Sequence, residues 1–245
     1  MTTVGLLRPE GHPEDDYRRI ETLLDSDIRV DSVAYRGPGE DPERLAAGAE
    51  ELRLAGAESV VWASTGGSFV HGWEAAHEQA RSLALAAGLP ASSTSIGFAH
   101  AVRAVGAARV AVAGTYPEDV TEGFARFLEA AGIEVVGVRR AFAAGPVAEL
   151  VRAADDPRAE AVLVPDTALP TVAALAGAEA AVGKPVLTGT QVTVWEGLRL
   201  AERRGAWADE LGALFAREEP GPEPPGEEPA GLPRPWEPRA REEPA

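Results

Sequence analysis

The feature that most constrains this chain is a regular alternation of short apolar runs with longer alanine-rich stretches. The apolar runs, rich in Val, Ile and Leu, cover residues 3–7, 29–35, 59–62, 109–113, 134–138, 161–164 and 185–187. The stretches with helical spacing of apolar residues cover residues 41–55, 72–87, 118–131 and 171–182. Gly88, Gly132 and Gly183 each follow such a stretch, as glycines that end helices do. Nearly continuous apolar strands that alternate with helices predict an α/β fold with parallel sheets covered on both faces.

The chain also repeats itself weakly. "HPEDDYRRIETLL" begins at His12 and "YPEDVTEGFARFL" begins at Tyr116, while "VVWAST" at Val60 matches "VLVPDT" at Val162. The two offsets are 104 and 102 residues. The first two segments each follow a predicted strand, and the other two each end one, at equivalent places in the two halves. We therefore predict two similar lobes, each a parallel sheet flanked by helices, related by a pseudo-twofold axis with the site in the cleft between them.

The expected boundaries follow from the repeat and from a change in composition. The first lobe covers residues 1–95 plus about 190–216, and the second covers residues 96–189. Residues 217–245 are rich in Pro and Glu, and such a segment buries too little apolar surface to offset the entropy of ordering. We expect this tail to be disordered.

Charge and cysteine content narrow the classes of function. The formal net charge is −16, which disfavours binding to nucleic acid or to anionic membranes. Cysteine is absent and the four histidines have no zinc-type spacing, so we expect no metal site. The first residues lack the pattern of a signal peptide, and no segment has the 18 or so apolar residues of a membrane span. These observations predict a soluble cytoplasmic protein.

Small and polar residues follow the two repeated strands, as "ASTGGSF" and "PDTALP". In parallel α/β sheets ligands bind outside the carboxyl ends of the strands, so Ser64, Thr65, Asp166 and Thr167 are expected to converge. Tyr116 follows another strand at the same edge. Hydroxyl groups and backbone N–H groups of this kind suit a carboxylate ligand. A phosphate loop is excluded because "STGGSF" lacks its lysine, and a glycine-rich turn with a helix cap is the alternative.

These segments resemble the aspartate/glutamate racemase superfamily, in particular its arylmalonate decarboxylase and maleate cis–trans isomerase branch. The resemblance covers about residues 3–204 and rests on "ASTGGSFVHG", "AGTYPEDV", "VLVPDTALPT" and "GKPVLTGTQVTVWEGLRLA" in this order. It implies a two-lobed fold, a small carboxylate as substrate, chemistry without a cofactor, and a homodimer.

The resemblance also implies catalytic positions. Ser64 stands where racemases and isomerases keep their first cysteine, and Asp166 stands where the second belongs. Both catalytic cysteine positions are thus substituted. Serine does not titrate usefully without a neighbouring base, and His71 is the only histidine close to it in sequence.

Further positions follow from the same resemblance and are assigned to substrate binding. Thr65, Gly66 and Tyr116 match the groups that hold a substrate carboxylate, and Thr167 would offer its backbone N–H beside Asp166. Thr190, in "TGTQ", is expected on a loop that lines the pocket.

Without thiols, an aspartate in a partly dry pocket such as Asp166 can have its pKa raised and can then give or take a proton on one face of the substrate only. We therefore expect a cysteine-independent decarboxylase or isomerase that passes through an enediolate-like intermediate. The alternative is a carboxylate-binding or accessory protein that has lost racemase or isomerase chemistry. For Asp166 itself the alternative is a helix N-cap, because a predicted helix follows it.

The acidic cluster at Glu14, Asp15 and Asp16 is expected to be a solvated loop. Arg8 beside it is an alternative contact for an anionic substrate.

Overall fold

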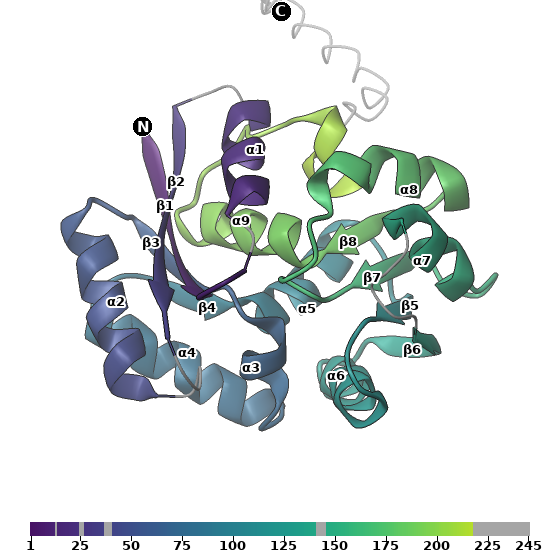
Figure 1. Cartoon of the computed structure of the whole chain (residues 1–245), viewed down its shortest axis with the longest axis horizontal. Helices are drawn as coiled ribbons and strands as arrows, with labels where there is room; N and C mark the ends of the chain where they lie inside the picture. The colour runs from purple at the N-terminus through teal and green to yellow at the C-terminus, as the bar shows by residue number, and fades with distance from the viewer. Residues whose placement is uncertain (13, 25–26, 37–40, 141–145, 218–245) are drawn as a thin grey trace, which may run out of the picture.

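The computed structural model describes residues 1–12, 14–24, 27–36, 41–140 and 146–217, so that the predicted tail lies outside the described residues from 218 onward. Two four-stranded sheets form the centres of two lobes, with all pairs of neighbouring strands parallel (Figure 1). The first sheet has the order β2-β1-β3-β4 and the second has the order β6-β5-β7-β8. The strands are β1 (Thr2–Pro9), β2 (Ile28–Tyr35), β3 (Ser59–Trp62), β4 (Ala91–Ser93), β5 (Arg109–Gly114), β6 (Glu134–Arg140), β7 (Ala161–Val164) and β8 (Val186–Thr188).

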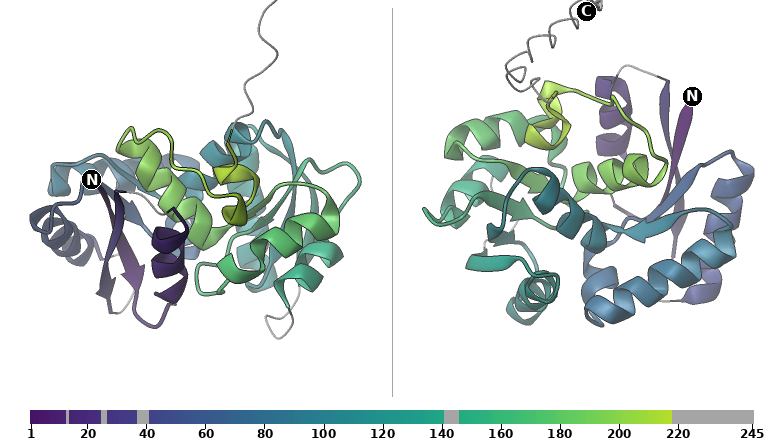
Figure 2. Two further views of the ribbon diagram at one scale, coloured as in Figure 1. Left: turned by 90° about the horizontal axis from the view of Figure 1, so that it is seen from above. Right: turned by 180° about the vertical axis from the view of Figure 1, so that it is seen from behind.

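Helices connect successive strands on both faces of each sheet (Figure 2). They are α1 (Asp15–Leu24), α2 (Pro42–Leu54), α3 (Thr65–Phe69), α4 (Trp73–Ala87), α5 (Thr94–Ala104), α6 (Glu118–Ala130), α7 (Val147–Ala154), α8 (Leu175–Val182) and α9 (Gly189–Leu200). Short 3-10 turns lie at Val172–Ala174, Asp209–Leu211 and Ala213–Phe215. Among the described residues, no helix has the length and apolar character needed to cross a membrane.

The central strands bury their two faces in different parts of the core. In the first lobe, Leu6 of β1 belongs to a central core that both lobes share, whereas Leu7 packs with α2 and α4 in an outer core. In the second lobe, Leu163 of β7 belongs to the central core, whereas Val162 packs with α7 and α8. This alternation explains why the central strands β1, β3, β5 and β7 are almost continuously apolar, since neither of their faces is exposed to water.

The two sheets confirm the predicted repeat, because β1 to β4 and β5 to β8 follow the same order. The glycines predicted to end helices do so: Gly88, Gly132 and Gly183 all have positive φ angles, of 61°, 80° and 66°. One strand, β4, is missing from the sequence prediction, because "ASS" is too short and too polar to be recognised without its neighbours. The helix predicted over residues 171–182 divides into a 3-10 turn and α8.

The packing of α9 against β1 in the central core can be tested by substitution of a glycine on α9. A Cβ atom at Gly197 would overlap the side chain of Val4 on β1, so Gly197→Ala should lower the free energy of unfolding by about 1–3 kcal/mol. Gly177 on α8 is the matched control, because it is exposed and a Cβ there meets nothing within 4 Å. Gly177→Ala should raise stability by about 0.5–1 kcal/mol. Urea denaturation measures both changes, and an equal effect of the two would contradict the packing of α9 on β1.

Candidate functional site

Three loops at the carboxyl ends of β3, β5 and β7 meet between the lobes. The hydroxyl of Thr65, at the start of α3, donates a 2.6 Å hydrogen bond to the carbonyl oxygen of Pro165, which follows β7. Thr65 is fully buried, so this bond is shielded from water and fixes one loop against the other. The structure therefore brings together the two strand ends that the repeat singled out.

Ser64 caps the short helix α3. Its Oγ accepts a 3.3 Å hydrogen bond from the backbone N–H of Gly67, and glycine is needed there because a Cβ would lie 2.8 Å from the ring of Trp62. The Ser64 hydroxyl also hydrogen-bonds to Tyr35, whose own hydroxyl accepts a 2.8 Å bond from Trp62 Nε1. Burial raises the pKa of Tyr35 and keeps this partner neutral. The arrangement suits a serine that donates hydrogen bonds.

Tyr116 lies across the junction of the two loops. Its hydroxyl donates to the carbonyl oxygen of Pro165 at 3.4 Å, and the Thr65 side chain and the backbone N–H groups of Gly66 and Thr167 face it closely enough to lower its pKa in part. Its ring packs edge-on against Phe69 of α3, with centroids 6.4 Å apart. Burial first, and then the negative charge of Asp166, raise the pKa of Tyr116 well above its ordinary value. The phenol therefore stays protonated and remains a hydrogen-bond donor.

Asp166 follows β7 directly and is partly buried. Its Oδ2 accepts a 2.5 Å hydrogen bond from Thr115 Oγ1, and its Oδ1 accepts a 2.8 Å bond from the backbone N–H of Ala168. The expectation that Asp166 is a helix N-cap is wrong, because the next helical turn begins at Val172 and its N-cap is Thr171. The carboxylate instead closes a local turn and lies near the Tyr116 hydroxyl.

Thr167 contributes to the same junction from both its backbone and its side chain. Its N–H faces Tyr116, and its Oγ1 lies 3.3 Å from His12 Nδ1 in the loop after β1. Arg8, the alternative contact for an anionic substrate, is largely buried and its guanidinium is engaged within the first lobe. It bonds to Ser32 Oγ, to the His12 carbonyl oxygen and to Glu14 at 3.1, 3.4 and 2.7 Å.

Thr190 is not on a loop, in contrast to the prediction, but lies in the first turn of α9. Its side chain is fully buried, and its Oγ1 donates to Asp16 Oδ2 at 3.2 Å. The same carboxylate oxygen accepts bonds from the backbone N–H groups of Thr171 and Val172 at 2.7 and 3.2 Å. Thr190 therefore belongs to a buried network that holds the segment after Asp166.

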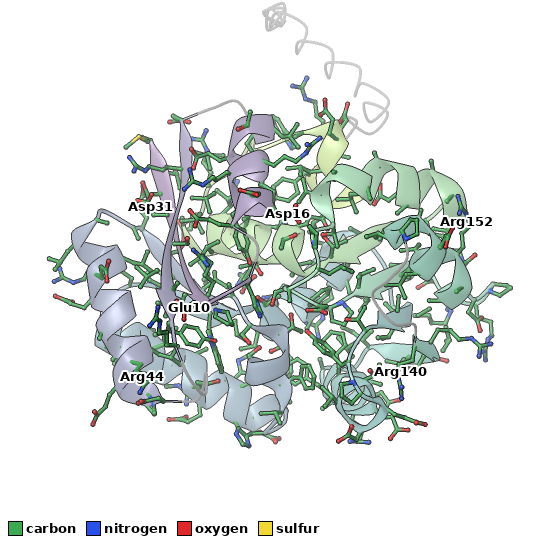
Figure 3. All side chains as sticks on the ribbon, viewed as in Figure 1. Glu10, Asp16, Asp31, Arg44, Arg140 and Arg152 are labelled. Atoms are coloured by element: carbon green, nitrogen blue, oxygen red, sulfur yellow. The ribbon has the colours of Figure 1, made fainter. Side chains whose placement is uncertain are left out.

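Asp16 itself corrects a second prediction. The acidic cluster lies at the start of α1 and is not wholly solvated. Asp16 is only 6% exposed and lies on α1 between the lobes (Figure 3). Its bonds to Thr171 and Val172 tie α1 of the first lobe to the chain that follows the Asp166 loop.

The structure adds three residues to the candidate site, Tyr35, Thr115 and His12. Tyr35 ends β2 and Thr115 follows β5, and nothing in their local sequence marks them as site residues. The sequence does contain a feature that points to His12, because His12 occupies the position in the first repeat that Tyr116 occupies in the second. His71, considered as a base for Ser64, is exposed at the opposite end of α3.

Comparison with known proteins identifies the family. A family model described as arylmalonate decarboxylase matches residues 26–215. The chain belongs to the arylmalonate decarboxylase family. It is 30% identical over 232 residues to the arylmalonate decarboxylase of Bordetella bronchiseptica, a match that covers 87% of this chain and 96% of that protein. This membership places it among the lyases and isomerases of the aspartate/glutamate racemase superfamily.

Solved structures agree with the family assignment. A crystal structure of arylmalonate decarboxylase superposes with a TM-score of 0.75 at 28% identity, covering 87% of this chain and 98% of that one. The maleate isomerase of Pseudomonas putida S16 superposes with a TM-score of 0.75 at 22% identity, over 88% and 98% of the two chains. The second likeness concerns the fold alone.

The tie formed by Asp16 can be tested by its removal. Asp16→Ala leaves two backbone N–H groups without their buried partner and leaves the Thr190 hydroxyl with Thr171 alone, so the free energy of unfolding should fall by about 2–4 kcal/mol. Asp15→Ala is the matched control, because Asp15 is the exposed neighbour in the same helical turn, and its effect should stay below about 1 kcal/mol. Chemical denaturation measures both variants. Similar values for the two would show that the Asp16 bonds contribute nothing to the joint.

Proposed function

We propose that this protein is a cofactor-independent and cysteine-independent decarboxylase of a small malonate-type dicarboxylic acid. The observation that carries the proposal is the convergence of Tyr116, two backbone N–H groups and the Asp166 carboxylate where the loops of the two lobes meet. The name of its relative, arylmalonate decarboxylase, supports a malonate that carries an aryl group.

The donors at this junction suit one carboxylate of the substrate. The Tyr116 hydroxyl is a neutral donor whose bond to the Pro165 carbonyl oxygen is long, at 3.4 Å, so that a substrate carboxylate can replace it, and the backbone N–H groups of Gly66 and Thr167 lie beside it from the two lobes. Ser64 Oγ accepts a bond from Gly67 N–H and its hydroxyl bonds to Tyr35, so Ser64 holds the loop that presents these donors. Fixed donors of this kind stabilise negative charge that develops on a carboxylate as an enediolate forms, because they need no reorganisation during the reaction.

The reaction balances with these groups alone. The bond between the α carbon and the second carboxylate breaks, carbon dioxide leaves, and the electron pair remains as the enediolate of the first carboxylate. The protonated carboxyl group of Asp166 then gives its proton to the α carbon, which forms the C–H bond of the product. One proton from solvent restores the enzyme in each cycle. Because Asp166 lies on one side of the junction, the proton arrives on one face.

A carboxylate-binding protein without chemistry remains the second candidate function. It is favoured by the same donors, since binding and catalysis both require them. Release of carbon dioxide from phenylmalonate, the simplest arylmalonate, separates the two candidates. Turnover that survives dialysis against a chelator would support chemistry without a metal.

Substitution of Asp166 tests its role as the acid. Asp166→Asn keeps the acceptor for Thr115 but carries no acidic proton, so release of carbon dioxide from phenylmalonate should fall by about 10²-fold or more while the fold is retained. Asp166→Ala should abolish turnover, and binding of the substrate should remain measurable. An Asn variant as active as the wild type would remove Asp166 from the mechanism.

The role of Tyr116 is tested by binding in the absence of turnover. With Asp166→Asn as background, the added change Tyr116→Phe should weaken phenylmalonate binding by about 1 kcal/mol, because it removes one hydrogen bond to a charged group. Isothermal titration calorimetry gives both affinities. If they are equal, the carboxylate is bound elsewhere.

A further inference from the structure

His12 lies opposite Asp166 at the junction of the lobes. It comes from the loop between β1 and α1, and its ring is half-buried. Its Nδ1 lies 3.3 Å from the hydroxyl oxygen of Thr167, the residue that follows Asp166 in the chain. A titratable ring of the first lobe is therefore held against the catalytic loop of the second.

The charges around His12 are few. Asp166 faces it from the loop after β7, and Arg8 faces it from β1, with the Arg8 charge paired to Glu14 at 2.7 Å. Burial lowers the pKa of His12 below its ordinary value of 6.5, Asp166 raises it, and Arg8 lowers it. Burial is the largest of these influences, so the imidazole changes charge at mildly acidic pH.

The contact with Thr167 accommodates both forms of the ring. A hydroxyl group can donate to a neutral imidazole nitrogen and can accept from a protonated one. The contact of His12 with Thr167 is therefore compatible with either protonation state, which is what a residue that loses and regains a proton in each cycle requires.

The proposed reaction creates a need for such a residue. After Asp166 gives its proton to carbon it is a carboxylate that accepts bonds from Thr115 and from Ala168 N–H. It must regain a proton before the next turnover. Imidazole is the side chain whose ordinary pKa suits proton transfer near neutral pH.

The internal repeat supports the placement. The two sheets have the same strand order, and "HPEDD" at His12 corresponds to "YPEDV" at Tyr116. The pseudo-twofold relation thus assigns His12 and Tyr116 to equivalent positions, one after β1 and one after β5. Tyr116 lies against both the loop of Thr65 and the loop of Thr167, whereas His12 contacts only Thr167 of these two residues.

We propose that His12 is the residue that returns a proton to Asp166 after each turnover. In this step the N–H bond of the imidazolium breaks, an O–H bond forms on the Asp166 carboxylate, and the neutral imidazole takes up a proton from solvent. His12 does not touch the substrate and acts through Asp166, as a positioning residue that also carries the proton. The inference rests on the proposed decarboxylation.

The pH profile of turnover tests the assignment. For the full-length wild type, release of carbon dioxide from phenylmalonate should fall as the pH rises from about 5 to about 7, because the pKa of His12 lies below its ordinary value and the imidazolium is lost in that range. His12→Gln and His12→Asn should lose this limb, with kcat at about pH 6 reduced by about 10²-fold and KM changed little. The Asn variant retains a side-chain N–H near the position of Nδ1 and so preserves the contact with Thr167. His77→Gln on α4 is the control, and its profile should match that of the wild type.

The outcomes separate the two claims. If the His12 variants keep the wild-type profile, or lose the same factor of activity at every pH, the proton-return role is wrong while the decarboxylase function stands. A wild type that releases no carbon dioxide from phenylmalonate overturns the proposed function and this inference with it. Melting temperatures of both His12 variants within a few degrees of that of the wild type show that the loss of activity does not come from unfolding.

Discussion

The hydrogen bond from Thr65 to the Pro165 carbonyl oxygen is the constraint on which the site depends. It joins the loop after β3 to the loop after β7, in a place that water does not reach. Tyr116 packs over this joint, and its hydroxyl faces groups of both loops. The bonds of Asp16 to Thr171 and Val172 hold the next part of the chain in the same way. Neither loop alone brings Tyr116, the backbone N–H groups and Asp166 together, so the proposed chemistry depends on the contact between the lobes.

Much of the fold follows from local sequence. The two sheets match the predicted alternation because buried parallel strands must be apolar on both faces, and glycines with positive φ end helices where expected. The repeat predicted that the strand ends that carry Ser64 and Asp166 converge, and the bond from Thr65 to the Pro165 carbonyl oxygen joins these two loops. The strand β4 escaped prediction because its pairing with β3, and not its composition, makes "ASS" a strand.

The parts of the site that sequence reasoning misplaced depend on contacts distant in the chain. Thr190 was assigned to a ligand because its motif resembles a pocket loop, yet its hydroxyl bonds to Asp16 on a helix 174 positions earlier. Asp166 was weighed as a helix cap because a helix follows, and the actual helix begins several residues later. His12 was visible only as the counterpart of Tyr116 in the repeat. The division into lobes at residues 95, 96 and 190 remains a prediction, as does the homodimer.

The central claim is that a single acid, Asp166, delivers a proton to one face of an enediolate formed between the two lobes. Turnover of phenylmalonate in deuterium oxide, with mass and chiral analysis of the product, measures this directly. The account predicts phenylacetate that carries one deuterium at the α carbon in one enantiomeric form. A product with equal amounts of the two enantiomers, or no release of carbon dioxide, would contradict it.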